Sequence, residues 1–463
     1  MDAAELVERV WARDATLWTG SDENRWLGWL DEPVRMSERL PELLAFAEDA
    51  RAAFDTTVLL GMGGSSLAPE VLRRTFGAEG FHVLDTTHPA AVRRLAGDLD
   101  SARTLFLVAS KSGTTLETRC HLDFFWKHAG ERGEAFVAIT DPGSELESVA
   151  QERGFRAVFP GEPTIGGRYS ALSAFGLVPA ALMGVDVDDL LGRASVLVEA
   201  SRGIEENVGL ELGLAIGKGW QEGRDKVLVR PNSGGFGLWA EQLLAESTGK
   251  EGKGLVPVPG EAAEGPDRQT AAVLAGEPYD LGIEFYRWEF AVAVAGAIMG
   301  LNPFDQPNVQ EAKDRTQEVL SGHGQVPGTG TGTGTGPEET GEGIEAVEDL
   351  LAGAAPPDYV AVQAFIDPAR EAELEPLVER ARATGCVVTV GLGPRYLHST
   401  GQLHKGGPPT GRFVQVVDDP GEELPIPGRE FGFRRLIEAQ ALGDLAALRE
   451  RGRPIVRVRL EDL

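Results

Sequence analysis

Short apolar runs that end in glycine-rich or hydroxyl-rich turns recur along this chain, and a helical pattern follows each turn. The clearest examples cover 56–66, 104–118 and 135–142, and a second set of the same kind begins near 205, with its clearest apolar run at 225–231. Strands that alternate with helices in this way predict a parallel, doubly wound sheet. Such sheets bind ligands in the loops at the carboxyl ends of their strands. We therefore expect an α/β protein with two doubly wound domains and a C-terminal α/β segment.

A low-complexity tract divides the chain near its last third. Residues 321–343 read SGHGQVPGTGTGTGTGPEETGEG, which offers almost nothing apolar to bury and much backbone entropy. This composition predicts a disordered linker. We expect a first domain with N-terminal helices, a second domain, and a C-terminal segment packed on the second domain, over 1–190, 191–320 and 344–463.

The charge balance limits the partners. A formal net charge of -28 argues against nucleic acid or an anionic membrane as the main partner, although a few local donors can still hold one phosphate. No apolar run reaches the roughly 20 residues that a membrane helix needs, and the acidic, amphipathic N-terminus does not resemble a signal peptide. The chain contains only two cysteines, which fits a reducing compartment. We expect a cytoplasmic protein.

Two turns carry the residue types that bind anions. GMGGSSL at 61–67 follows an apolar run, and its glycines let a ligand approach the backbone. SKSGTTLET at 110–118 brings hydroxyls and free amides together at a helix start, a combination that matches a phosphate dianion. The alternatives are a tight turn needed only for packing and an ordinary helix cap.

Two further motifs carry groups suited to proton transfer. GGRYS at 166–170 contains Arg168, whose guanidinium could stabilise a developing enolate oxygen. EQLLAESTGK at 241–250 places Gln242 and Glu246 four residues apart, hence on one helical face. Each motif taken alone is more often a surface feature.

The last two motifs are NPFDQPNVQEAK at 302–313 and HSTGQLHKGG at 398–407. Pro307 can begin a helix that carries Lys313. Histidine titrates near neutral pH, which suits proton transfer to a sugar ring oxygen. A surface lysine and a solvated histidine loop are the alternatives.

Together these motifs resemble those of the phosphoglucose isomerases, a family with sugar-isomerase (SIS-type) domains. GMGGSSLAP is similar to that family's GIGGSxLGP, SKSGTTLET to its SKTFTTxET, GGRYS to its GGR[FY]S, AESTGK to its ESNGK, and NPFDQPNVQEAK to its N-[PS]-F-D-Q-x-G-V-E-x-x-K. All five occur in the family's order. The C-terminal segment, with LHSTGQLHKGGPPTG, resembles the isomerase part of bifunctional transaldolase/phosphoglucose isomerases.

The resemblance implies a role for each matching residue. Glu246 would be the base that moves a proton between C1 and C2 through a cis-enediol, Arg168 would stabilise the enediolate, and Lys313 would help open the ring. The residues implied in substrate binding are Gly64, Ser65, Ser110, Lys111, Ser112, Thr115, Thr118, Gln242 and Gln306.

Several positions depart from the family pattern. Ser112 and Gly113 replace Thr and Phe of the phosphate turn, and Asn308 replaces a glycine. The family's NGQH histidine motif normally precedes the DQ segment, whereas the best match here, ending at His404, follows it with one extra residue. The ring-opening acid is therefore open between His404 and His398. In the family this histidine comes from a partner subunit, so a homodimer stays open as well.

The sequence predicts an enzyme that interconverts D-glucose 6-phosphate and D-fructose 6-phosphate in glycolysis and gluconeogenesis. No histidine–carboxylate cluster has ligand spacing, so we expect neither a metal nor a cofactor. The alternatives are a relaxed isomerase that also accepts mannose 6-phosphate, and a non-catalytic sugar-phosphate-binding regulator.

Overall fold

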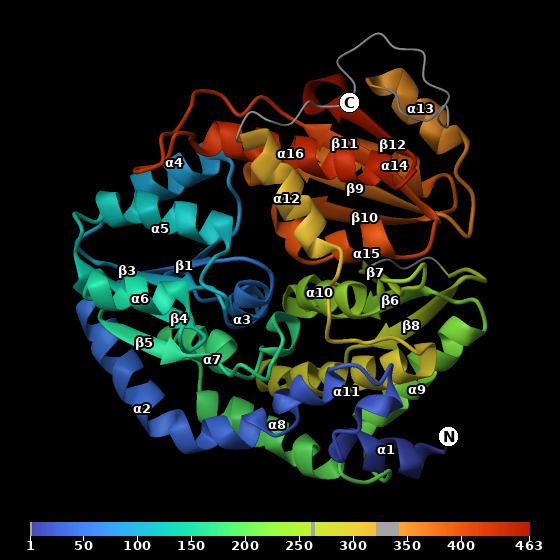
Figure 1. The fold of residues 1–463 in the computed structure, drawn as a ribbon, viewed down its shortest axis with the longest axis horizontal. Coiled ribbons are helices and arrows are strands. Elements are labelled where there is room, and N and C mark those ends of the chain that lie inside the picture. Colours follow the sequence, from blue (N-terminus) through green and yellow to red (C-terminus); the bar gives the residue numbers. More distant parts are fainter. Residues whose placement is uncertain (1, 261–263, 321–341) are drawn as a thin grey trace. The chain divides into compact units, whose positions relative to one another are not determined.

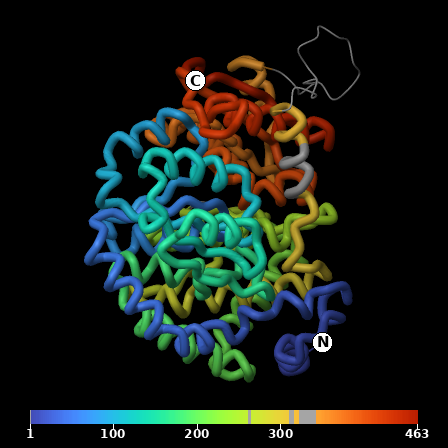
Figure 2. The backbone as a smooth tube through the Cα atoms, turned by 60° about the vertical axis from the view of Figure 1, so that its left-hand side comes forward, coloured from blue at the N-terminus to red at the C-terminus, as the bar shows by residue number. Residues whose placement is uncertain are grey.

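The computed structural model describes residues 2–260, 264–320 and 342–463, without the side chains of 309–314. These residues form two compact units, and each unit is assembled from separate stretches of chain. Unit 1 comprises 1–85, 99–248 and 259–305, and unit 2 comprises 86–98, 249–258 and 306–463. Figure 2 shows the blue segment 86–98 of unit 2 beside the red C-terminal elements of the same unit. The division expected at 190, 320 and 343 stays a prediction.

Unit 1 contains a five-stranded parallel sheet in the order β2-β1-β3-β4-β5. Figure 1 labels its strands β1, β3, β4 and β5. Its strands are β1 (Thr56–Gly61), β2 (Phe81–Leu84), β3 (Thr104–Ala109), β4 (Phe136–Thr140) and β5 (Ala157–Pro160). The central strands β3 and β4 are buried along their whole length, which explains why their sequences are continuous apolar runs rather than alternating ones. The helices α5 and α6 cover β3 and β4, respectively. The helices of this part are α1 (Ala3–Trp11), α2 (Glu32–Ala53), α3 (Leu67–Phe76), α5 (Leu116–His128), α6 (Glu145–Glu152), α7 (Ala174–Leu182) and α8 (Val187–Ala200).

The second α/β set has a smaller sheet in the order β7-β6-β8. Its strands are β6 (Lys226–Arg230), β7 (Val256–Pro259) and β8 (Arg268–Ala272). Its helices are α9 (Val208–Gln221), α10 (Gly237–Thr248) and α11 (Leu281–Met299). Because α11 packs against α8, α9 and α10, it is buried on almost every side and carries apolar residues all round.

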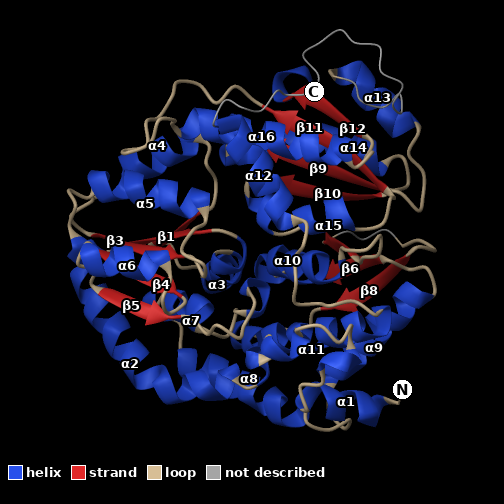
Figure 3. Cartoon of the chain, viewed as in Figure 1, coloured by secondary structure: helices blue, strands red, loops and turns tan. Residues whose placement is uncertain are grey.

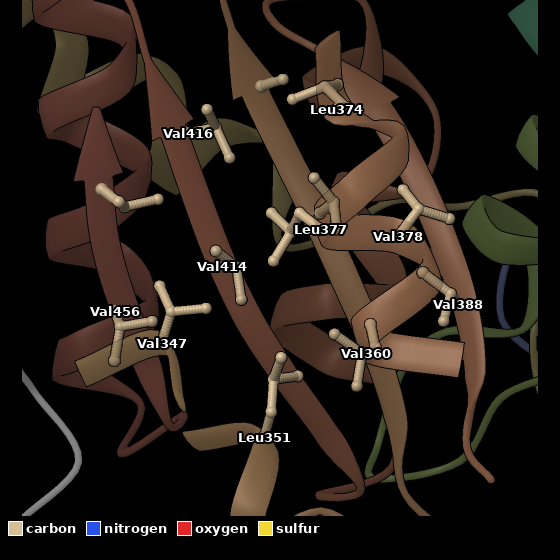
Figure 4. Close-up of a cluster of buried hydrophobic side chains, with 14 of the residues drawn as sticks. Val347, Leu351, Val360, Leu374, Leu377, Val378, Val388, Val414, Val416 and Val456 are labelled. Atoms are coloured by element: carbon tan, nitrogen blue, oxygen red, sulfur yellow. The ribbon is translucent and has the colours of Figure 1, made fainter. Parts of the chain in front are cut away.

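Unit 2 contains a four-stranded parallel sheet in the order β10-β9-β11-β12 (Figure 3). The strands are β9 (Tyr359–Phe365), β10 (Val387–Leu392), β11 (Gly411–Val417) and β12 (Ile455–Arg459). Figure 4 shows the aliphatic side chains that fill one face of this sheet, among them Val360, Val414 and Val456 from the strands and Leu351 and Leu377 from helices. The helices of unit 2 are α4 (Pro89–Asp98), α12 (Val309–Leu320), α13 (Ile344–Ala352), α14 (Glu375–Arg382), α15 (Gly401–Gly406) and α16 (Phe433–Glu450).

The expected α/β class with parallel sheets is confirmed, and each apolar run quoted above forms a strand. The first of the expected N-terminal helices, α1, ends at Trp11. Arg13 has a left-handed backbone with φ of 55°, and the Asp14 side chain caps a separate short turn. Most of the tract expected to be a linker, 321–341, lies outside the described residues. Within the described part of the chain, no helix is long and apolar enough to cross a membrane.

Candidate functional site

The turns after β1 and β3 leave the same edge of the five-stranded sheet. Gly61 pairs with Ala109 in the parallel register, so the two turns that the sequence singled out begin side by side. This edge is formed by the carboxyl ends of the strands, where α/β proteins place their ligand sites.

The turn after β3 is closed by its own hydroxyl groups. The Ser110 and Thr115 hydroxyl oxygens lie 3.0 Å apart, and the Gly113 amide donates to the Ser110 hydroxyl at 3.2 Å. Ser112 is exposed, and its hydroxyl lies 3.0 Å from that of Thr114. The turn therefore gathers hydroxyls just before α5. Thr118, inside α5, is fully buried, and its hydroxyl has no hydrogen-bond partner among the described residues.

Gly113 is required by the backbone of this turn. Its φ is +72°, and a Cβ built on it would lie 2.6 Å from the Leu146 amide nitrogen. A side chain would meet both steric strain and a clash with the start of α6. The departure from the family's bulky residue at this position thus follows from the local path of the chain.

Lys111 is engaged within the scaffold. Its ammonium group donates to the Asp141 carboxylate at 2.5 Å and to the Glu162 carbonyl at 2.9 Å. Burial raises the pKa of Asp141, and Lys111 opposes that rise. The sequence missed Asp141, although its position directly after β4 was the available signal. The binding role expected for Lys111 stays a prediction.

The glycine-rich turn after β1 packs directly on the GGRYS turn. A Cβ on Gly64 would lie 2.0 Å from the Gly167 carbonyl oxygen, so only glycine permits this approach. Ser65 is buried in the same turn. The first and third motifs of the sequence therefore meet in unit 1, and Arg168 follows the contact point.

Arg168 is fixed by groups from two other motifs. Its guanidinium donates to the Ser247 hydroxyl at 2.8 Å and to the carbonyls of Pro303 and Asp305 at 2.6 and 3.0 Å. The side chain is 1% exposed. A buried guanidinium held in this way has one orientation, and another of its nitrogens lies 3.5 Å from a Glu246 oxygen.

Glu246 lies in the last turn of α10 and is held from both sides. The Gln242 amide donates to Glu246 Oε2 at 2.9 Å, one helical turn earlier, while Arg168 approaches Oε1. Glu246 is only 8% exposed. The predicted base, its predicted amide partner and the predicted guanidinium thus form one cluster.

The remaining predicted residues belong to unit 2. Gln306 is exposed just before α12, and Lys313 is in α12 among the residues whose side chains are not described. His404 is buried in α15, with its ring beside those of Tyr359 and Phe413. The Tyr359 hydroxyl lies 3.2 Å from His404 Nδ1.

Burial lowers the pKa of His404 to about 3, and the neighbouring Lys405 and Arg453 charges act in the same direction. Its imidazole is therefore neutral at neutral pH, and a neutral imidazole is a poor proton donor. His398 is half-buried in the short turn that precedes α15.

Gln402 connects the C-terminal motif to other parts of unit 2 by hydrogen bonds, and sequence reasoning did not single it out. Its amide donates to the Gly249 carbonyl at 2.9 Å and to the Asn308 side chain at 2.7 Å, and it accepts from the Asn308 amide at 2.9 Å. Asn308, where the family has glycine, thus has a partner in this chain. The GQL segment of the motif was the available signal, but the hydrogen-bond partners of Gln402 are distant in sequence.

Comparison with known proteins finds a family similarity in the first part of the chain. Residues 45–221 match the family model "Phosphoglucose isomerase". The matched segment includes the glycine-rich turn, the hydroxyl turn and the GGRYS turn described above.

Curated relatives are similar to this chain over a longer stretch. A glucose-6-phosphate isomerase of Thermosynechococcus vestitus is 35% identical over 268 residues, covering 54% of this chain and 50% of that protein. One of Thermus thermophilus is 37% identical over 199 residues, covering 41% and 47%. The chain thus spans about half the length of the curated relatives that it matches.

Solved structures share the fold. A hypothetical protein of Thermus thermophilus has a TM-score of 0.60 and 27% identity, over 68% of this chain and 94% of that one. A glucose-6-phosphate isomerase of Chlamydia trachomatis has a TM-score of 0.52 at 20% identity, over 70% and 79%, which shows the fold alone.

No group of three or more histidine, cysteine or acidic side chains within the described residues could hold a metal ion.

Proposed function

We propose that this protein interconverts D-glucose 6-phosphate and D-fructose 6-phosphate by proton transfer between C1 and C2. The observation that supports the proposal most directly is the cluster of Glu246, Gln242 and Arg168. It joins a buried carboxylate to a fixed guanidinium beside the Gly64 turn. The similarity to curated glucose-6-phosphate isomerases points to the same chemistry.

Glu246 is the base in this proposal. It takes the proton from C2 of the open-chain aldose and returns it to C1 of the cis-enediol, so one carboxylate serves both directions. The Gln242 amide holds Oε2, which fixes the orientation of the carboxylate.

Arg168 stabilises the negative charge that develops on the enediolate oxygen. Because its guanidinium is already held by Ser247, Pro303 and Asp305, it needs little reorganisation when the charge appears.

The hydroxyl turn 110–118 binds the phosphate. Ser110, Ser112 and Thr115 contribute hydroxyls, and the turn precedes the amino end of α5, where the helix dipole favours an anion. Lys111, Thr118 and Gln306 are further binding residues on the family resemblance, and Gly64 and Ser65 line the sugar.

Ring opening requires a proton donor to the ring oxygen. A neutral His404 is a poor donor, so we assign this step first to Lys313 and keep His404 and His398 as the residues to compare with it. Lys313→Met should impair turnover of cyclic fructose 6-phosphate more than proton exchange on an open-chain analogue, since only the former needs ring opening.

A coupled assay tests the proposal. Purified protein receives fructose 6-phosphate, and glucose 6-phosphate formation is followed, with mannose 6-phosphate assayed separately. Glucose 6-phosphate formation that disappears in Glu246→Gln supports the proposal. Sugar-phosphate binding without turnover would instead favour the regulator, and equal production of mannose 6-phosphate would favour the relaxed isomerase.

A further inference from the structure

Unit 2 contains a cavity of about 600 Å³ that the proposed isomerase chemistry does not use. Its walls come from the ends of three strands, β9, β11 and β12, and from one face of α16. The size lies within the range of small-molecule sites. Its lining residues are Phe365, Val417, Asp418, Asp419, Pro420, Arg434, Ile437, Glu438, Ala441, Leu442, Arg457 and Arg459.

The position of the cavity follows from the strand order. β9 is the first strand of the unit 2 sheet, β10 lies on one side of it, and β11 lies on the other. The chain therefore changes direction between β9 and β11, and open α/β sheets place ligands at the carboxyl ends of the strands at such a switch point. Phe365 ends β9 and Val417 ends β11, and the two residues pair in register.

The floor of the cavity is apolar. Phe365 and Val417 come from the sheet, and Ile437 and Ala441 come from α16, four residues apart on one face of the helix. A floor of this kind suits the carbon skeleton of a ring-sized ligand.

Most of the charged groups around the cavity already have partners. The Asp418 carboxylate lies 3.1 Å from His88 Nε2 and accepts from the Asp367 amide at 2.9 Å. Arg434 donates to Glu438 at 3.0 Å and lies 3.6 Å from Asp419.

The amino end of α16 is also satisfied. The amides of Arg434 and Arg435 donate to the Glu423 carboxylate at 2.8 and 3.2 Å. The helix end therefore offers no free amides to a ligand. The charge of a ligand that fits the cavity depends instead on the cationic side chains that remain.

Two further charged groups of the cavity lining are the arginines of β12. Arg457 and Arg459 are two residues apart, hence on the same face of the strand. Within the described part of the chain, no hydrogen bond or ion pair engages the Arg457 guanidinium, and the ion-pair partner of Arg459 is Glu461 at 3.8 Å. Arg457 is half-buried. Burial lowers its pKa while the Glu342 and Glu438 carboxylates act in the opposite direction, and a bound anion would offset more of the cost of its charge.

A row of polar side chains continues inward from the cavity. Gln363, Gln415 and Arg457 pair across β9, β11 and β12, one row below Phe365, Val417 and Arg459 on the same face. Gln363 is 1% exposed, and neither of its amide atoms has a hydrogen-bond partner among the described residues. Unsatisfied buried amides are costly in a packed sheet, and they are typical of places where a ligand or water completes the hydrogen bonding.

We propose that this cavity is a second small-molecule site, and that it binds a small phosphomonoester. The phosphate lies at Arg457 and Arg459, and the carbon ring lies on the Phe365–Val417–Ile437 floor. Guanidinium groups match the oxygens of a phosphate in geometry and charge. The site is independent of the isomerase chemistry proposed for unit 1.

Phenyl phosphate is a suitable probe, with inorganic phosphate lacking the ring and benzyl alcohol lacking the charge. Binding is measured by calorimetry on the full chain that carries Ser110→Ala and Thr115→Ala, so that the hydroxyl turn of unit 1 contributes little. We expect phenyl phosphate to bind more tightly than either control compound.

Arg457→Met should raise the dissociation constant for phenyl phosphate by about ten- to a hundredfold, the loss typical of a charged hydrogen-bonding group. Arg457→Lys, which keeps the charge, should lose less. Arg382→Met, an exposed arginine on α14, is the matched control and should change nothing. If Arg457→Met does not fold, the exposed Arg459→Met replaces it. An unchanged dissociation constant, absence of saturable binding, or equally tight binding of benzyl alcohol would overturn the proposal.

Discussion

At the scale of single residues, Glu246 carries the sharpest prediction. Glu246→Gln keeps the shape of the side chain but removes the proton acceptor, so kcat should fall by about 10²–10⁴-fold. The exposed Glu211 on α9 offers a matched control, since Glu211→Gln changes the same charge away from the site. The measurement is the rate of glucose 6-phosphate formation from fructose 6-phosphate. A folded Glu246→Gln variant with normal kcat would remove Glu246 from the chemistry.

A second prediction concerns Glu289 and the pH dependence of the protein's stability. It is 1% exposed in α11, it accepts a backbone hydrogen bond from Ala171, and its Oε1 has no partner among the described residues. Burial raises the pKa of Glu289 well above its usual range, and nearby Glu32 adds to that rise. The carboxyl group is therefore protonated in the folded protein at pH values where it ionises in the unfolded chain.

The sign of the pH dependence follows from this difference. Below the unfolded pKa, near 4.5, both states are protonated and the contribution of Glu289 to stability is complete. As pH rises toward the folded pKa, that contribution is lost at up to about 1.4 kcal/mol per pH unit. Glu289→Gln removes this pH dependence. In urea unfolding, the free energy of unfolding of the variant should therefore rise relative to that of the wild type between about pH 5 and pH 8. A constant difference, equal to that of the exposed control Glu205→Gln, would contradict the prediction.

At the scale of elements, the hydroxyl turn between β3 and α5 should govern substrate affinity. Ser110→Ala combined with Thr115→Ala removes two phosphate donors, so KM for fructose 6-phosphate should rise by at least about tenfold, with a smaller change in kcat. Ser148→Ala, at an exposed position of α6, is the control. Inhibition by a phosphorylated sugar acid should weaken in parallel. Unchanged inhibition would exclude the turn as the phosphate site.

The strand–turn–helix elements could be predicted from sequence, because hydrophobic periodicity and glycine positions are local signals. The turns after β1 and β3 are examples. The contacts that organise the site are not local. Arg168 is held by carbonyls more than 130 residues later, and Lys111 is paired with Asp141 across two strands. The surroundings of His404 were also hidden, since the rings of Tyr359, Tyr396 and Phe413 lie around it and Tyr359 comes from a separate strand 45 residues earlier. A sequence motif can identify such residues, but it does not show which distant residues surround them in the fold.

Two substitutions in the short helix α15 distinguish the role of Gln402 from that of His404. Gln402→Leu leaves the Gly249 carbonyl and Asn308 without their partner, so the melting temperature and kcat should both fall. His404→Phe fits a pocket already formed by the rings of Tyr359 and Phe413, so its effect on kcat should be much smaller. The reverse order of the two effects would return the ring-opening role to His404.

At the scale of the whole molecule, unit 2 is held together by chain segments on both sides of 321–341. α12 packs along α16, and Arg94 of α4 pairs with Asp367 at 2.8 Å. His88 lies against Asp418, and Gln402 is bonded to Gly249. These contacts are buried or partly buried and join sequences more than a hundred residues apart. Unit 2 therefore does not depend on the covalent link through 321–341.

Cutting the chain within 321–341 should therefore leave one folded particle. A protease site placed in this tract is predicted to be cleaved readily, because the sequence there has almost nothing apolar to bury. After cleavage the two fragments should elute together in native size-exclusion chromatography and separate only in denaturant. Replacing 321–343 with a Gly/Ser tract of equal length should keep activity within about twofold, because the replacement keeps the length of the connection and the sequence it replaces has almost nothing apolar to pack. The uncut protein with the same inserted site is the control. Fragments that separate in native buffer would show that the contacts of Asp367, Asp418 and Gln402 are too weak to hold the C-terminal segment.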